Sequence, residues 1–486
     1  MTDLNASAGA GPTNLLTGDR HQTHEPEPRR FGFAIVAGEP PVRVIVIGAG
    51  QVGSNIAASL DHDHHVVVVD TDPSRIEAIT YSHDVLTVRG DGTAIETLEE
   101  AGIENADLVI ASTDIDETNI VICGAAKAVG DPFTIARVKQ TGLLRTWERS
   151  EGAFGVDFMV GTNLQTAQSI VRIAGLPGAH DVETFSNGLV RMAEFEVMAD
   201  SPIAGETVSD AARYESLTFA ALLRGDDVIV PVGETVIKTG DAVVVIGSVE
   251  SVRAFADFVT PPPSLEDVRE IVIVGGGEIA AQTARLFEAE GIDTRLVERD
   301  PERARELAEN LPRTMVLQSD ATDIDFLVRE HVDESDLVVA TLDSDEKNLL
   351  VSLLAKRVGV ERTIGVVDAG EYVDLFETVG LDVGVNPRLV TAEEITRFTR
   401  ARRTENVAML ESDRAEVLEI EVDRDSVLFE TQIEEAMADL PDGIVIGAIT
   451  RDEELITPRG ETVVEGDDHV VVFVDTRVVD EATAAL

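Results

Sequence analysis

Short apolar segments alternate with amphipathic segments between residues 42 and 180. Segments 42–47, 66–70, 85–88, 108–111 and 134–138 are rich in β-branched residues and have the length of β-strands. The segments between them carry apolar residues at helical spacing, so strands and helices alternate along the chain. This order is typical of βαβ units, and it predicts a parallel sheet with helices on both faces.

Residues 181–260 have a different pattern, in which strands dominate. Segments 189–197, 217–223 and 243–246 are predicted strands, Gly-Asp turns separate them, and helical spacing is scarce. We therefore expect a small α+β module after the first parallel sheet.

Both parts occur a second time in the chain. The motif around Gly48 returns around Gly275, Asp116-Glu-Thr-Asn119 returns at 345–348, and the Gly-Glu-Thr-Val turn at 233–236 returns at 460–463. The predicted fold class is therefore α/β, with two tandem Rossmann-like, doubly wound parallel-sheet domains, each followed by a small α+β module. The predicted boundaries are a disordered arm at 1–41, Rossmann domain 1 at 42–180, its module at 181–260, a proline-rich linker at 261–267, Rossmann domain 2 at 268–403 and its module at 404–486.

Charge restricts the partners that we expect. The chain has 39 basic and 91 acidic residues, a net charge of −52, and only five lysines. Such an excess repels phosphate backbones, so no nucleic-acid partner is predicted. Molar salt shortens the Debye length to about 3 Å and screens this self-repulsion, so we expect a halophilic source.

The chain has no feature of a membrane-spanning or secreted protein. Its apolar runs fall far short of the roughly 18 residues that a membrane-spanning helix needs. Residues 1–41 lack the apolar core of a signal peptide, and the single cysteine, Cys123, cannot form an internal disulfide. We expect a cytoplasmic protein with Cys123 in its core.

The strongest candidate site is the glycine-rich turn after the first strand. In a Rossmann fingerprint the three glycines make a tight turn, admit a pyrophosphate and let the helix pack closely, and the next helix directs free N–H groups at the anion. Asp70 lies 20 residues after Gly50, where a carboxylate accepts hydrogen bonds from the adenosine ribose and favours NAD(H) over a 2′-phosphorylated cofactor. The predicted contacts in the turn are Gly48, Ala49, Gly50, Gln51, Val52 and Gly53.

The second copy repeats this arrangement, with Glu298 in the place of Asp70. A Rossmann scaffold without a ligand remains an alternative, especially here. Glu278 would place a carboxylate where the first copy has neutral Gln51, and Val366 stands where the first copy has Arg137, so we expect the first half to bind nucleotide more tightly. The predicted contacts in this turn are Gly275, Gly276, Gly277, Glu278, Ile279 and Ala280.

Four further residues are predicted at the edge of the clefts. Asp91 and Asp320 follow the third strands, although turn residues of this type need no function. Thr113 and Thr341 are predicted to end the fourth strands, at the carboxyl edge where ligands of such sheets lie.

Other patterns give weaker indications. The run 61–65 contains three histidines, but its counterpart at 288–292 contains none, so no metal site is predicted. The chain also has a cluster of basic residues: Arg397, Arg400, Arg402 and Arg403. This cluster has two possible explanations, favourable charge at a helix C-terminus or docking to an acidic partner or anionic lipid. Walker, Gly-x-Ser-x-Gly and His-Glu-x-x-His motifs are absent, and no catalytic residue is predicted.

Four motifs indicate one family: the glycine motif at 46–53, Asp-Glu-Thr-Asn at 116–119, Ile-Ala-Arg at 135–137 and the repeated Gly-Glu-Thr-Val turns. In these motifs the chain resembles the TrkA family of potassium uptake proteins. The resemblance implies two tandem domains that regulate potassium conductance, in a ring-like homo-oligomer on the inner face of the membrane. It further implies an integral-membrane Trk subunit as partner, control by NAD(H), and Arg137 as a nucleotide contact. Relatives that respond to ATP often carry arginine after the second glycine, where this chain has Gln51 and Glu278. ATP or ADP is therefore the less favoured ligand.

Two other functions remain open from the sequence. An NAD-dependent oxidoreductase would need a general acid, usually histidine or lysine, and neither His180 nor His331 occupies a repeated motif. A nucleotide-gated subunit of another transporter would carry the same motifs.

Overall fold

The computed structural model describes residues 42–61, 64–150, 153–176, 178–225, 227–259, 270–400, 404–409, 415–424, 426–452 and 454–486. The predicted arm at 1–41 and linker at 261–267 lie outside these residues. Among the described helices, none combines the length and the hydropathy needed to cross a membrane.

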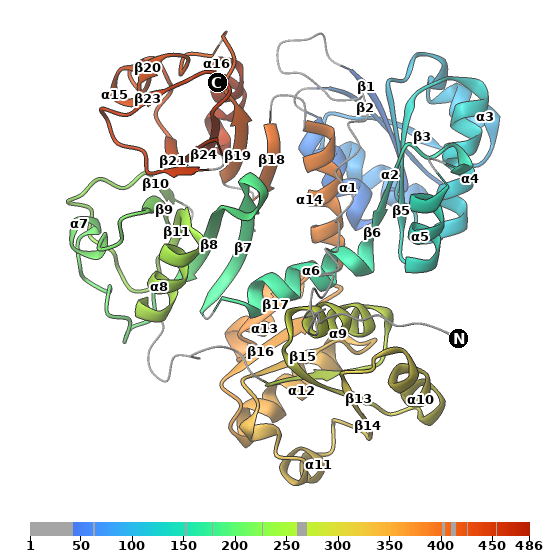
Figure 1. The fold of residues 1–486 in the computed structure, drawn as a ribbon. Helices are drawn as coiled ribbons and strands as arrows, with labels where there is room; N and C mark the ends of the chain where they lie inside the picture. The colour runs from blue at the N-terminus through green and yellow to red at the C-terminus, as the bar shows by residue number, and fades with distance from the viewer. Residues whose placement is uncertain are drawn as a thin grey trace, which may run out of the picture. The chain divides into compact units, whose positions relative to one another are not determined.

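The first repeat begins with a parallel sheet of strand order β3-β2-β1-β4-β5-β6 (Figure 1). Its strands are β1 (Arg43–Ile47), β2 (His65–Asp70), β3 (Leu86–Arg89), β4 (Leu108–Ala111), β5 (Phe133–Val138) and β6 (Phe158–Gly161). Its helices are α1 (Gln51–Leu60), α2 (Pro73–Ser82), α3 (Ile95–Glu100), α4 (Asp116–Val129), α5 (Thr141–Arg149) and α6 (Thr162–Ala174). The strand order reverses between β1 and β4, which is where such sheets bind ligands.

The second repeat has the same strand order, β14-β13-β12-β15-β16-β17. Its strands are β12 (Glu270–Val274), β13 (Asp293–Glu298), β14 (Met315–Gln318), β15 (Leu337–Ala340), β16 (Arg362–Val366) and β17 (Val383–Val385). Its helices are α9 (Glu278–Glu290), α10 (Pro301–Asn310), α11 (Ile324–Arg329), α12 (Asp345–Val358), α13 (Val373–Val379) and α14 (Pro387–Arg400).

An antiparallel module follows each parallel sheet, and the two modules share one topology. The first has the order β10-β9-β11-β8-β7 and consists of β7 (Ala179–Phe185), β8 (Val190–Glu196), α7 (Val208–Ala211), β9 (Leu217–Arg224), β10 (Asp227–Ile229), β11 (Ala242–Ser248) and α8 (Val249–Val259). The second has the order β18-β19-β24-β21-β22 and consists of β18 (Thr404–Met409), β19 (Ala415–Glu421), β20 (Thr431–Gln432), α15 (Ile433–Ala436), β21 (Ile444–Arg451), β22 (Glu454–Ile456), β23 (Val463–Val464), β24 (His469–Asp475) and α16 (Val479–Ala485). These observations confirm the predicted fold class; β7 crosses the expected boundary at residue 180.

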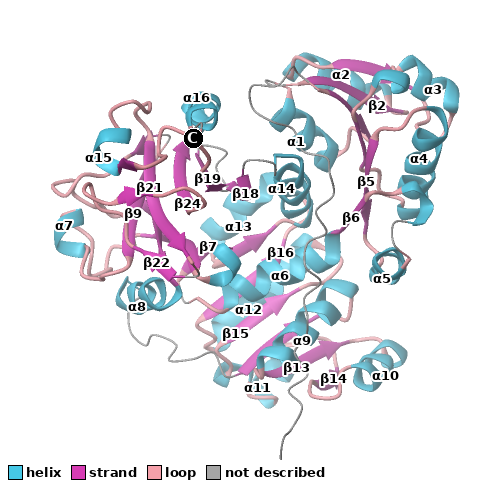
Figure 2. Cartoon of the chain, turned by 45° about the horizontal axis from the view of Figure 1, so that its top comes forward, coloured by secondary structure: helices cyan, strands magenta, loops and turns pink. Residues whose placement is uncertain are grey.

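The last helix of each parallel-sheet domain packs against the other domain. Ala392 and Ile395 of α14 belong to the apolar core beneath β1 and α1, while Ile170 and Ile173 of α6 belong to the core beneath β12 and α9. Phe398 of α14 also stacks on aromatic rings of β5 and β6. Figure 2 shows α14 beside α1 accordingly. This exchange of helices brings the start of each one toward the glycine turn of the opposite half.

The two modules share a core as well. Phe185, Met192 and Ile246 of the first module pack with Val471 and Phe473 of the second. At the edge of this core the buried Glu419 carboxylate accepts hydrogen bonds from Ser186 N–H and Oγ, at 2.9 and 2.8 Å. The two repeats therefore contact each other through both of their parts.

Candidate functional site

The first glycine turn requires glycine for steric reasons. Gly48 has φ of +104°, a left-handed conformation that few side chains adopt, and its N–H donates to Val69 O. A Cβ at Gly53 would overlap Gly48 O. At Gly50, which precedes the first residue of α1, a Cβ would meet only the Arg75 guanidinium, at 3.5 Å. Free N–H groups of the first turn of α1 thus border an open space on the Gly50 side.

Asp70 links this turn to the end of the second strand by hydrogen bonds. Its buried carboxylate accepts hydrogen bonds from Ala49 N–H at 2.7 Å and Asp72 N–H at 2.8 Å. Arg75 Nη1 lies 3.8 Å from Asp70 Oδ2. The carboxylate predicted to bind ribose therefore also holds the turn in shape.

The second turn has the same geometry with a different contact set. Gly275 has φ of +106° and donates to Val297 O, and a Cβ at Gly277 would meet nothing within 4 Å. Glu298 accepts from Asp300 N–H at 2.6 Å, while Arg303 Nε donates to Gly276 O at 2.7 Å. Arg75 and Arg303 occupy equivalent positions, in an Asp-Pro-x-Arg sequence that sequence reasoning missed although it is repeated.

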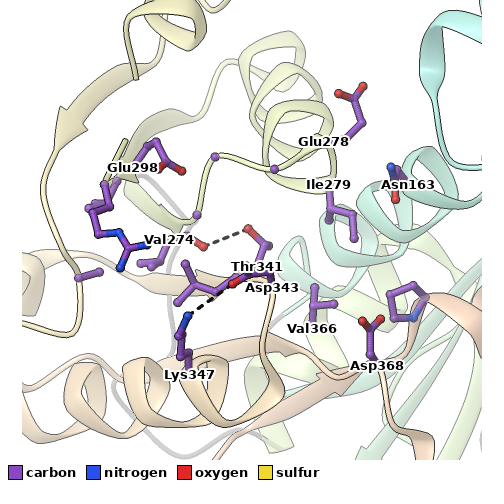
Figure 3. A pocket seen from close by; sticks show the side chains of 18 of the residues that line it. Asn163, Val274, Glu278, Ile279, Glu298, Thr341, Asp343, Lys347, Val366 and Asp368 are labelled. Atoms are coloured by element: carbon purple, nitrogen blue, oxygen red, sulfur yellow. Dashed lines mark hydrogen bonds and ion pairs between the residues drawn. The ribbon is translucent and has the colours of Figure 1, made fainter. Parts of the chain in front are cut away.

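A cavity of about 570 Å³ opens beside the second turn, and Figure 3 shows the side chains around it. Predicted residues that line it are Gly275, Gly276, Gly277, Glu278, Ile279, Glu298, Asp320, Thr341 and, from the first half, Arg137. Ala280 is fully buried beneath the turn. Residues that line it without having been predicted include Lys139, Asn163, Arg299, Lys347 and Arg388.

The lining of this cavity is far less acidic than the chain as a whole. Five of its residues are basic and five are acidic, in a chain that carries 39 basic and 91 acidic residues. Two of the five lysines of the chain, Lys139 and Lys347, are among them. The cavity can therefore accept an anion that most of the surface would repel.

Glu278 does not face the expected pyrophosphate position. Its carboxylate accepts hydrogen bonds from Thr141 Oγ1 and Gln282 Nε2, both at 2.7 Å, and Figure 3 shows it directed away from Thr341 and Asp368. Burial raises the pKa of Glu278, but these hydrogen bonds, together with the charges of Arg285 and Arg303, outweigh burial and leave the pKa below its ordinary value. Its negative charge is thus kept, and it is held at the contact between the halves rather than toward the expected pyrophosphate position.

The threonines at the cleft edge are not equivalent residues. Thr341 directly follows β15 and donates to Val274 O, as Ser112 directly follows β4 and donates to Ile47 O. Thr113 is one residue further on, and its N–H and Oγ1 both donate to Asn119 Oδ1. Ser112 is therefore the counterpart of Thr341, and the pairing expected from the sequence is shifted by one residue.

Asp91 and Asp320 each close a turn on their own loop. Each accepts hydrogen bonds from the N–H and Oγ1 of the threonine two residues later, Thr93 or Thr322. These hydrogen bonds hold the pKa of both carboxyls below the ordinary range. The turn explains both residues, and Asp320 also lines the cavity.

Arg137 lies where the two halves meet. Its side chain is only 4% exposed, its Nε donates to Thr162 Oγ1 at 3.1 Å, and its Nη1 lies 3.5 Å from Asp114 Oδ1. Lys139 Nζ lies 3.4 Å from the same oxygen. Burial raises the pKa of Asp114, but Lys139 and Arg137 together outweigh burial and leave the pKa below its ordinary value.

The remaining candidates have structural partners. Arg397 faces Glu183 of β7 at 3.4 Å and Glu394 at 3.6 Å, so it joins α14 to the first module. The side chain of Arg400 and residues 402 and 403 lie outside the described part of the chain. In the histidine run, Asp61 hydrogen-bonds His83 at 3.2 Å. Cys123 is buried, and burial raises the pKa of its thiol.

Comparison with known protein families gives two matches in each repeat. The TrkA-N domain matches residues 44–159 and 271–387, and the TrkA-C domain matches residues 192–260 and 417–486. Each parallel sheet thus corresponds to a TrkA-N domain and each antiparallel module to a TrkA-C domain.

Relatives align with this chain over most of their length. The Trk system potassium uptake protein TrkA homolog of Archaeoglobus fulgidus is 36% identical over 434 residues, which cover 89% of this chain and 97% of the relative. The TrkA protein of Halomonas elongata is 32% identical over 446 residues, which cover 89% and 96%. Among solved structures, the GsuK channel has a TM-score of 0.56 at 18% identity, covering 94% of this chain and 80% of that one. A GsuK channel bound to NAD has a TM-score of 0.54 at 19% identity, covering 94% and 82%.

Proposed function

Because the chain belongs to the TrkA family of Trk potassium uptake proteins, we propose that it is the nucleotide-binding regulatory subunit of a Trk-type potassium uptake system. The observation that carries this proposal is the duplicated glycine turn. In each copy a helix N-terminus borders an open space beside Gly50 or Gly277, and a carboxylate closes the second strand. That arrangement suits the pyrophosphate and ribose of a dinucleotide.

The ligand that we propose is NAD(H), bound by each half. Asp70 and Glu298 stand where the adenosine ribose would lie, and their charge would repel a 2′-phosphate. Pyrophosphate would meet the N–H groups that follow Gly50 and Gly277. ADP or ATP is a second candidate, because Arg137, Lys139 and Arg388 supply the positive charge that Gln51 and Glu278 lack.

The proposed partner is an integral-membrane Trk subunit that conducts potassium, bound by a homo-oligomer of this chain on the cytoplasmic side. Relatives that align over 89% of this chain are named Trk system potassium uptake proteins, which supports the proposal. A ligand controls such an assembly only by binding two of its states with different affinity.

An NAD-dependent oxidoreductase is less well supported than regulation. Two lysines line the cavity, but Lys139 is paired with Asp114 and Lys347 with Asp343, at 3.4 and 3.6 Å. Both therefore stabilise neighbouring carboxylates rather than standing free as general acids. The family of potassium uptake proteins likewise favours regulation.

Binding and flux measurements test the proposal together. Calorimetric titration in molar KCl should show NADH binding at least tenfold tighter than NADPH binding. Potassium flux into vesicles that hold the co-purified membrane subunit should change with NADH or NAD⁺ only when this chain is present. Failure to bind either cofactor, or steady oxidation of NADH by the purified chain, would contradict the proposal.

A further inference from the structure

One arginine side chain contacts the first glycine turn and lines the cavity at the second. Arg388 lies at the start of α14, the helix that packs against the first half. Its Nη1 donates to Gln51 Oε1 at 3.0 Å, and Gln51 is the first residue of α1. The same residue lines the cavity that Gly277 and Glu278 also line.

Gln51 is held against the second half by more than this bond. A Cβ at Gly370 would lie 2.7 Å from Gln51 Nε2, so the amide packs closely on the backbone between β16 and α13. The helix start at which an anion would bind in the first half is therefore in direct contact with the second half.

The surroundings of Arg388 favour an anion. Burial lowers the pKa of Arg137, and the charge of Arg388 lowers it further, so the two guanidinium groups are close enough to repel each other. Asp114 is attracted by both of them and by Lys139. Asp368 also lines the cavity. A phosphate placed here would relieve the repulsion between the two arginines.

We propose that Arg388 couples the two clefts, an inference that rests on the proposed function. A nucleotide in the second cleft draws the guanidinium toward its phosphates and away from Gln51. The first cleft then loses a positive charge next to its helix N-terminus. Occupancy of the second cleft therefore weakens binding in the first, and the reverse holds by linkage. Loss of one charge-assisted hydrogen bond corresponds to a change of roughly tenfold in affinity.

The test compares single-site and two-site binding of NADH in molar KCl. The Gly50→Asp and Gly277→Asp variants are each designed to block one cleft, and neither added Cβ meets backbone. They give the affinity of the remaining cleft alone. We expect the second binding step of the unmodified chain to be about tenfold weaker than these single-site values predict. In the Arg388→Gln variant, the affinities of the two binding steps should match the single-site affinities. Those affinities are measured after Gly50→Asp or Gly277→Asp is combined with Arg388→Gln.

Three controls make the result specific to Arg388. Arg305→Gln removes an exposed arginine of α10 that does not line the cavity, and should leave the coupling intact. Arg388→Lys keeps the charge and should retain part of the coupling. Combining Gln51→Ala with Arg388→Gln should change the coupling no more than Arg388→Gln does. Circular dichroism reports whether each variant is folded.

The outcomes separate this inference from the proposed function. If NADH binds both clefts independently, or if Arg388→Gln and Arg305→Gln show the same coupling, Arg388 does not couple them. Binding at a single cleft in the unmodified chain would also overturn the inference, while leaving the proposed ligand in place. Absence of any NADH binding would refute the proposed ligand itself.

Discussion

Replacing Asp70 by asparagine tests whether one carboxylate both holds the first glycine turn and selects the cofactor. Its two oxygens accept from Ala49 N–H and Asp72 N–H, at 2.7 and 2.8 Å, in a buried setting. An amide has one acceptor oxygen, so one of these N–H groups must face an NH₂ group instead. Loss of one hydrogen bond to a charged group lowers the free energy of unfolding by roughly 1.5–3 kcal/mol.

Glu298→Gln is the matched control, because it makes the same chemical change at the equivalent place. Glu298 accepts one described hydrogen bond, from Asp300 N–H, and a glutamine oxygen can keep that bond. We expect a loss below about 1 kcal/mol. Removal of one negative charge relieves self-repulsion similarly in both variants, so their difference reports the lost hydrogen bond together with the Arg75 contact of Asp70.

The assay is urea denaturation in molar KCl without nucleotide, followed by NADH and NADPH titrations. Asp70→Asn should unfold at lower urea than Glu298→Gln. It should also raise NADPH affinity relative to NADH by about tenfold, because the 2′-phosphate then meets Arg75, 3.8 Å from the present carboxylate, without a like charge. Equal unfolding midpoints for the two variants would refute the structural role, and an unchanged cofactor ratio would refute the selective one.

Three further predictions concern ligand sites, pH and salt. Gly50→Asp and Gly277→Asp should each abolish one NADH binding event at unchanged thermal stability, because neither added Cβ meets backbone; loss of both events in either variant would contradict this. Burial raises the pKa of Glu377, in α13, to about 7. The protonated carboxyl therefore contributes its full stabilisation below about pH 4.5, and this contribution to the free energy of unfolding is lost as the pH rises toward 7. Glu377→Gln should therefore stabilise the chain at pH 8 but not at pH 5, as measured by denaturation; an equal effect at both pH values argues against the assignment. NADH affinity should increase from 0.1 to about 2 M KCl, since salt screens the repulsion between the anion and a chain of net charge −52; calorimetry showing a decrease would mean that contacts within the cleft dominate.

The sequence predicted those parts of the fold that local patterns determine. Segment 108–111 coincides with β4, and the strand predicted at 66–70 differs from β2 by one residue at its start. Glycine at 48 and 275 was placed at tight turns, and both residues have positive φ. These strands and turns could be predicted because a run of β-branched residues followed by glycine is a local pattern, and because the whole pattern occurs twice.

Contacts between the repeats could not be predicted in this way. Nothing near Gln51 in the sequence indicates that Arg388 bonds to it, because the two residues are 337 positions apart. Glu278 was expected to face a pyrophosphate, yet Thr141 of the first half binds its carboxylate. Periodicity shows which face of α14 is apolar but not which sheet that face covers.

The exchange of helices gives a physical reason for keeping both repeats in one chain. Without α14, the core beneath β1 would lose Ala392, Ile395 and the ring of Phe398, and apolar strand residues would meet water. The same helix brings Arg388 to the first turn, so the contacts that complete the core also carry side chains into the opposite cleft. A shift of α14 that follows a ligand in one cleft must therefore change the packing and the charge at the other. Arg397 joins α14 to Glu183 of the first module, so such a shift would also change this ion pair.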